Sequence, residues 1–107
     1  MASTKIETGI NGFGRFGLHL LKYWLDRSKE SNFTIDYIND DYLDLDQIYE
    51  IIISDKAVNF GKYKVQKRGQ VLRFIEADGT LHELEVTNSV KDKIPWIGRP
   101  FLFLECS

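Results

Sequence analysis

The sequence predicts an α/β fold in which parallel strands are combined with an antiparallel β insertion. A glycine-rich stretch first joins a short β-rich segment to an amphipathic one, and strand-like and helix-like patterns then alternate. Such alternation indicates βαβ units with parallel strands. Residues 62–88 differ, because they contain two turn signals, "KRGQ" and "ADGT". An Asp-Gly dipeptide between β-rich segments is typical of a hairpin, so this part is predicted to be antiparallel.

The first half of the chain is predicted to form strand, helix, strand and helix. Residues 5–10 (KIETGI) are a short β-rich segment, and residues 33–39 (FTIDYIN) alternate like a second strand. Between them, apolar or small residues at positions 13, 16, 17, 20, 21 and 24 have the spacing of one buried helix face. That helix should end near the polar residues 26–32. Residues 44–54 predict a second, shorter helix with Asp44 or Asp46 near its start.

The second half is predicted to contain the antiparallel insertion and one further strand. Residues 62–88 should form two or three short antiparallel strands, and residues 93–100 a loop. The continuous apolar run 101–106 (FLFLEC) is typical of a strand buried on both faces. We therefore predict a partial Rossmann (doubly wound) sheet with an antiparallel β insertion. Residues 1–107 would form a single, incomplete N-terminal dinucleotide-binding domain.

Composition excludes several function classes. The chain has 107 residues and a net charge of -2, which gives no general electrostatic basis for holding nucleic acid or an anionic membrane. The basic cluster Lys62, Lys64, Lys67 and Arg68 is better explained as a solvated hairpin face. The single cysteine, Cys106, excludes an internal disulfide. With no signal-peptide core and no membrane-length apolar run, we expect a cytoplasmic protein with neither nucleic acid nor membrane as partner.

The stretch "GINGFGRFG" (residues 9–17) contains the pattern G-x-G-x-x-G at Gly12, Gly14 and Gly17. In a dinucleotide site the first glycine allows a tight turn, the second lets the backbone approach a pyrophosphate, and the third lets the helix pack close to the strand. The N–H groups at the helix N-terminus then face the phosphates. The alternative is a glycine-rich turn that binds no ligand.

An acidic pair follows the second predicted strand, in "YINDDY" at Asp40 and Asp41. A carboxylate at this place in a dinucleotide site accepts hydrogen bonds from the adenosine ribose, and it disfavours a 2′-phosphate. The pair therefore favours NAD over NADP as cofactor. The alternative is a turn or helix-capping cluster before Leu43, for which Asn and Asp are well suited.

The glycine stretch and the "IND" after the second strand, together with "KIPW" at 93–96 and the closing "LECS", resemble the N-terminal part of glyceraldehyde-3-phosphate dehydrogenase. The similarity runs, with gaps, over nearly the whole chain. It implies NAD as cofactor, a homotetrameric parent, and a place in glycolysis. There, glyceraldehyde 3-phosphate is oxidised with NAD and phosphate to 1,3-bisphosphoglycerate.

The resemblance also implies a set of cofactor-binding residues. Arg15 and Phe16 would contact the pyrophosphate, and Asp40 the ribose. Asp41 departs from the proline usual in the family, and Ser89 from an arginine, which alters the adenine side. The full set is Asn11, Gly12, Phe13, Gly14, Arg15, Phe16, Gly17, Asn39, Asp40, Asp41, Ser89, Cys106 and Ser107.

The catalytic cysteine and histidine of that family have no counterpart here, so we expect no catalytic residue, no metal ligand and no activity from this chain alone. Cys106 is expected to be a buried, inert thiol, and His19 and His82 to be surface residues. Two alternatives remain: a fragment of erythrose-4-phosphate dehydrogenase, or a non-catalytic module that binds a nucleotide or a protein partner. We also expect the chain to associate with itself through open sheet edges.

Overall fold

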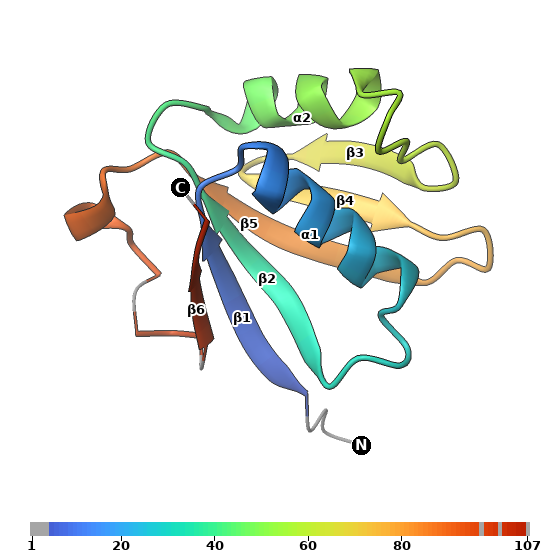
Figure 1. Ribbon diagram of the computed structural model, residues 1–107, viewed down its shortest axis with the longest axis horizontal. Coiled ribbons are helices and arrows are strands. Elements are labelled where there is room, and N and C mark those ends of the chain that lie inside the picture. The colour runs from blue at the N-terminus through green and yellow to red at the C-terminus, as the bar shows by residue number, and fades with distance from the viewer. Residues whose placement is uncertain (1–4, 97, 101, 107) are drawn as a thin grey trace.

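The computed structural model describes residues 5–96, 98–100 and 102–106, which form a mixed six-stranded sheet with two α-helices (Figure 1). The alternation of strands and helices predicted from the sequence is confirmed. The elements in chain order are β1 (Ile6–Asn11), α1 (Arg15–Asp26), β2 (Phe33–Asn39), α2 (Leu45–Ser54), β3 (Lys64–Arg68), β4 (Val71–Ile75), β5 (Leu81–Thr87), the 3₁₀ turn η1 (Lys91–Lys93) and β6 (Leu102–Glu105).

The strand order is β3-β4-β5-β2-β1-β6. Strands β5, β2, β1 and β6 run parallel to one another, whereas β3, β4 and β5 form two antiparallel hairpins. The two hairpin turns contain Gly69 and Gly79, both with positive φ, as the turn signals predicted. The α/β class with an antiparallel insertion is thus confirmed.

Both helices pack on the same face of the sheet and share one hydrophobic core with it (Figure 1). Every fully buried aliphatic side chain in this core is worth about 1.5–3 kcal/mol relative to an exposed one. The helix and sheet residues that meet there include Leu18, Leu21, Ile48 and Ile52 from the helices and Ile10, Ile38, Leu72, Leu84 and Val86 from the strands.

The buried face of α1 differs from the predicted one. Phe16, placed on that face by its spacing, is 65% exposed, and Leu20 is only half-buried. The helix instead buries Gly17, Leu18, Leu21, Trp24 and Leu25. Successive helical residues turn by about 100°, so a face centred on these positions leaves Phe16 on the opposite side.

The prediction that residues 101–106 form a strand buried on both faces is wrong. Within the described residues β6 is an edge strand paired only with β1, and Leu102 and Phe103 are 41% and 37% exposed. Leu104 alone of these three packs partly against the core. An apolar run has the same sequence signature at an edge as at the centre of a sheet, which explains the error.

The segment between β5 and β6 brings the Trp96 side chain onto the sheet. Trp96, fully buried, lies directly on β1: a Cβ at Gly9 would come within 2.3 Å of its ring. Tyr37 of β2 stacks on the same indole, with ring centroids 5.3 Å apart. Trp96 therefore covers part of β1 and β2.

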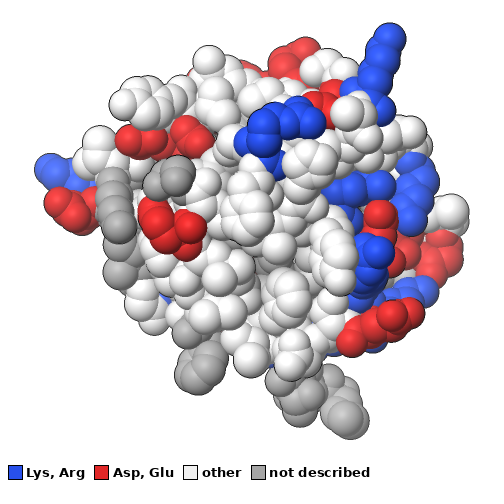
Figure 2. All heavy atoms as spheres, in the orientation of Figure 1, with Lys and Arg blue, Asp and Glu red and all other residues white. Residues whose placement is uncertain are grey.

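Polar side chains on the helix side mix both charges. Figure 2 shows basic and acidic residues intermingled at the right of the molecule, near the hairpin end of the sheet. Lys62 pairs with Asp26 and Lys67 with Asp46, each at 3.0 Å, in agreement with a solvated hairpin face. None of the helices in the described part of the chain is long and apolar enough to cross a membrane.

The two histidines have different surroundings. His19 is exposed on α1, as predicted. His82, predicted to be a surface residue, is instead largely covered: its ring lies 2.7 Å from a Glu76 carboxylate oxygen and edge-on to Trp24. The residues next to His82 in the sequence did not indicate that it is covered, because the covering side chain, Trp24, comes from α1.

Candidate functional site

Four parallel strands, β5, β2, β1 and β6, end at one edge of the sheet, and the glycine loop (residues 12–17) leaves from this edge (Figure 1). In open α/β sheets, ligands bind in the crevice outside the carboxyl ends of such strands. The structure brings most of the predicted site residues to this edge. It is therefore the candidate site.

The three glycines of the loop differ in whether the path of the backbone requires them. Gly12 has a φ of 101°, which favours glycine, and its N–H donates to the Asn39 carbonyl at 2.7 Å. A Cβ at Gly17 would lie 2.6 Å from the Gly12 carbonyl oxygen, so only glycine lets α1 start this close to β1. A Cβ at Gly14 would meet nothing within 4 Å. The chain path therefore accounts for Gly12 and Gly17 but not for Gly14.

Gly14 is the N-cap of α1, and it offers no side chain to the N–H groups of the first turn. The first turn also contains no acidic residue. The leading N–H groups of a helix have no partner within it, and they carry the positive end of its dipole. The start of α1 is therefore chemically suited to an anionic group such as a phosphate.

The Arg15 side chain is engaged by Asp55, which lines a hollow beside the loop. Its guanidinium donates to the carboxylate of Asp55, the C-cap residue of α2. A hydrogen bond from the Val58 backbone N–H and the contact with Arg15 hold the pKa of the Asp55 carboxyl below its usual range. Any contact of Arg15 with a phosphate would thus come most directly from its backbone N–H.

Asp40 is buried, with 8% of its surface exposed, and it lies directly after β2. One carboxylate oxygen accepts from the Phe13 N–H at 2.8 Å, and the other from the N–H groups of Tyr42 and Leu43 at 2.8 and 2.9 Å. Asp40 thus ties the glycine loop to the turn before α2. This is the capping role that the sequence left open, while contact with a ribose stays a prediction; Asp41 beside it is exposed.

The last residues of the parallel strands face one another in register. Asn11 of β1 lies beside Asn39 of β2 and Glu105 of β6, and Asn39 lies beside Thr87 of β5. Their side chains form a continuous row of hydrogen bonds, which Trp96 extends by donating its Nε1–H to Thr87 Oγ1 at 3.0 Å. We call this row the amide ladder.

Asn39 is the centre of the amide ladder, and it is fully buried. Its Nδ2 donates to Asn11 Oδ1 and to the Ser89 carbonyl, both at 2.9 Å. Its Oδ1 accepts from Thr87 Oγ1 at 2.7 Å and from the Ser89 N–H at 3.0 Å. An amide side chain has two donor and two common acceptor positions, and all four are occupied by the protein.

Two further predicted residues, Ser89 and Cys106, lie at the same edge. Ser89 is held through its backbone by Asn39. Cys106 donates its N–H to the Asn11 carbonyl at 2.7 Å and is only half-buried; burial and then the neighbouring Glu105 raise the pKa of its thiol. Ser107 lies outside the described residues.

Sequence reasoning missed Thr87, Glu105 and Trp96. Thr87 and Glu105 are the final residues of their strands, so the sequence could have placed them at the carboxyl ends. Their hydrogen-bond partners, however, depend on the register of strands that are far apart in the chain. Trp96 had no signal that would link it to Thr87.

Two hollows adjoin the site. One of about 450 Å³ lies beside the glycine loop, with Gly14 and Arg15 on one side and Leu43 and Ile51 on the other. A second, of about 420 Å³, lies at the carboxyl end of β5, where Thr87, Asn88 and Ser89 form one wall. Both hollows are open to solvent rather than closed cavities.

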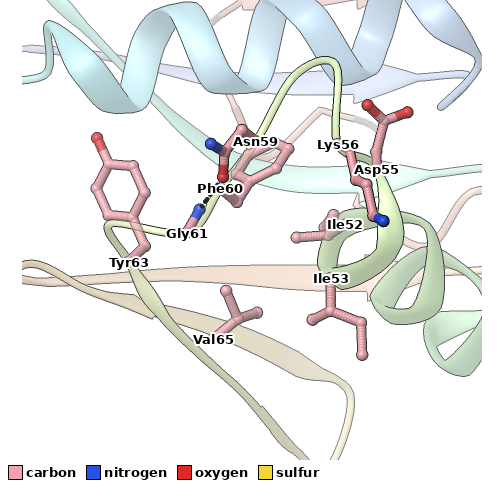
Figure 3. A pocket seen from close by; sticks show the side chains of 9 residues that line it. All are labelled: Ile52, Ile53, Asp55, Lys56, Asn59, Phe60, Gly61, Tyr63 and Val65. Atoms are coloured by element: carbon pink, nitrogen blue, oxygen red, sulfur yellow. Dashed lines mark hydrogen bonds between the residues drawn. The ribbon is translucent and has the colours of Figure 1, made fainter.

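A third hollow, of about 300 Å³, lies between the end of α2 and the start of β3 (Figure 3). Three of its polar side chains are engaged within the protein: Asn59 accepts from the Gly61 N–H, Asp55 pairs with Arg15, and Tyr63 donates to Asp26. Lys56 also lines the hollow, and the other side chains of its wall are apolar. Within the described residues, no group of three or more His, Cys, Asp or Glu is arranged to hold a metal ion.

Comparison with known proteins leaves the family open. No protein-family model matches this chain, and no curated protein matches it.

Proposed function

We propose that this chain binds NAD at the carboxyl edge of its parallel strands, as a dinucleotide-binding domain of the Rossmann type. The pyrophosphate would lie against the glycine loop and the first turn of α1. The adenosine would extend toward Asp40 and the end of β5. The carboxylates of Asp40 and Asp41 favour NAD over NADP, since a 2′-phosphate would bring negative charge toward them.

The observation that carries this proposal is the open space at Gly14. Gly12 is needed for its positive φ and Gly17 for the close approach of α1 to β1, so either could belong to a purely structural turn. Gly14 has a negative φ and no neighbour that a Cβ would touch. A glycine that the fold does not need, located at a bare helix N-terminus, is explained by a ligand that approaches the backbone.

The resemblance to glyceraldehyde-3-phosphate dehydrogenase extends the proposal to a reaction. The chain would supply the cofactor domain of a phosphorylating aldehyde dehydrogenase, and the nucleophile and base would come from outside the described residues. The role of this chain would then be to bind NAD and to exclude NADP.

Gly14→Ala tests the proposal, with NAD and NADP binding measured by titration calorimetry. We expect NAD affinity to fall by about tenfold or more, because a Cβ would push a phosphate away from charge-assisted hydrogen bonds worth about 1.5–3 kcal/mol each. The thermal unfolding midpoint should stay within a few degrees of wild type, since the added methyl group meets no atom within 4 Å.

Gly17→Ala is the matched variant. Its methyl group would collide with the Gly12 carbonyl, so we expect about 1–3 kcal/mol of lost stability. Unchanged NAD affinity in Gly14→Ala, or no NAD binding by the folded wild-type chain, would overturn the proposal. Asp40 is a poorer choice for this test, because its carboxylate holds the loop itself.

A further inference from the structure

The amide ladder has a fixed direction. At one end, the Glu105 carboxylate only accepts hydrogen bonds, and both of its oxygens lie within reach of Asn11 Nδ2, at 2.7 and 3.1 Å. This orients the Asn11 amide so that its Oδ1 faces β2. Asn39 must then present its Nδ2 to that oxygen, as it does at 2.9 Å.

The opposite end imposes the same orientation. An indole N–H only donates, so the Trp96 bond takes an acceptor lone pair of the Thr87 hydroxyl. The hydroxyl proton is then directed to Asn39 Oδ1, 2.7 Å away. The two ends of the row therefore agree on one orientation of the Asn39 amide, although they lie on opposite sides of it.

Once oriented, Asn39 joins the two walls of the candidate site. Its side chain binds both backbone groups of Ser89, while its own carbonyl accepts from the Gly12 N–H at 2.7 Å. Gly12 begins the glycine loop, and Thr87 and Ser89 line the hollow at the end of β5. Asn39 is thus one link between loop and hollow; Asp40 is another, since it accepts from the Phe13 N–H and from Asn88 Nδ2.

We propose that Asn39 is a positioning residue that sets the spacing between the glycine loop and the Ser89 segment for a bound dinucleotide, without contacting the dinucleotide through its side chain. This inference rests on the proposed function. It also assigns a role to Asn11, Thr87 and Glu105, which orient the Asn39 amide. Asn39 is in the cofactor-binding set that the family resemblance implies, and a side-chain contact with the cofactor would require breaking one of its four hydrogen bonds.

Asn39→Asp is the direct test. It preserves volume but replaces a donor by an oxygen that faces two acceptors, Asn11 Oδ1 and the Ser89 carbonyl. We expect NAD affinity measured by calorimetry to fall by at least about tenfold. Circular dichroism establishes that the variant is folded.

A second substitution, Glu105→Gln, should restore part of the NAD affinity if the orientation of the amides in the ladder controls binding. When Asn39→Asp is combined with Glu105→Gln, the amide introduced on β6 donates to Asn11 Oδ1, and the flipped Asn11 amide donates to the new carboxylate on β2. The net charge equals that of wild type. We expect the double variant to regain a several-fold part of the lost affinity, because the Asn11 contact is restored while the Ser89 carbonyl contact is not. Glu105→Gln alone completes the double-mutant cycle.

Thr87→Val provides a gentler test if Asn39→Asp does not fold. It removes the hydroxyl between Trp96 and Asn39, and we expect a several-fold loss of NAD affinity. Thr34→Val, at the other end of β2, is its matched control and should bind NAD like wild type.

The outcomes separate this inference from the proposed function. A wild-type chain that binds no NAD overturns both. Wild-type binding with undiminished affinity in folded Asn39→Asp or Thr87→Val overturns the positioning role alone. A double variant no better than Asn39→Asp would show that the direction of the ladder does not control binding, and it too would overturn the inference.

Discussion

The carboxylate of Asp40 holds two segments of the chain at once, the glycine loop and the turn before α2. It accepts from three backbone N–H groups, one in the glycine loop and two in the turn before α2. Hydrogen bonds to a charged group contribute more than those between neutral groups, and a buried N–H left without a partner is costly. Asp40 is thus a structural residue of this edge whether or not it also contacts a ribose.

Asp40→Ala is therefore expected to lower the free energy of unfolding by about 2–3 kcal/mol. Urea denaturation followed by circular dichroism measures the change. Asp41→Ala, next in the chain but exposed, is the control and should stay within about 0.5 kcal/mol of wild type. Equal effects of the two substitutions would contradict the structural role of Asp40.

At the scale of the elements, the C-terminal end of α1 depends on side chains that contact its last residue. Its last residue is Asp26, whose negative charge is unfavourable at a helix C-terminus. Tyr63 Oη donates to this carboxylate at 2.8 Å, and Lys22 and Lys62 approach it at 3.0 Å. Burial alone would raise the pKa of the Asp26 carboxyl, but these contacts outweigh it and leave the pKa below its ordinary value of 3.8.

This depressed pKa makes stability depend on pH in a definite direction. A carboxyl whose pKa is lower in the folded state stabilises the fold fully above its unfolded value of 3.8, and the contribution is lost as pH falls through the folded pKa. Tyr63→Phe should cost about 1 kcal/mol at pH 7. We expect the difference from wild type to shrink in strongly acidic solution.

Urea unfolding of both proteins at neutral pH and well below pH 4 measures this effect. Tyr23→Phe, at an exposed position on α1, is the control and should show no such pH dependence. A Tyr63→Phe deficit that stays constant with pH would mean that the hydroxyl does not stabilise the ionised carboxylate.

At the scale of the whole molecule, the two edges of the sheet differ. Edge strand β3 carries Lys64, Lys67 and Arg68, charges of the kind that oppose pairing with another chain. Edge strand β6 exposes Leu102 and Phe103 instead. An apolar edge strand can pair with a strand of another chain, so we expect the predicted self-association to involve β6 in particular.

Leu102→Lys is expected to reduce this association. Light scattering over a range of protein concentrations should show a smaller increase in apparent mass for the variant than for wild type. Leu81→Lys is the matched control, because Leu81 is also 41% exposed but lies on β5, an inner strand of the sheet. A wild-type chain that stays monomeric at high concentration would contradict the prediction.

Local signals in the sequence were sufficient for much of the fold. The boundaries of β2 agree with the predicted residues 33–39, and α2 begins after Asp44, where a capping box with Gln47 satisfies the first turn. The hairpin turns at Gly69 and Gly79 also follow from neighbouring residues. Each of these features depends on interactions within a few positions of the chain.

The sequence by itself determined the kinds of elements, their order and the glycine loop between β1 and α1. Only the tertiary structure decided that β6 exposes Leu102 and Phe103, that Trp24 covers His82, and that Asn11, Asn39, Thr87 and Glu105 form one ladder. The physical reason is the range of the interactions. Turns and caps depend on residues a few positions apart, whereas Asn11 and Glu105 are 94 positions apart and meet only through the register of parallel strands.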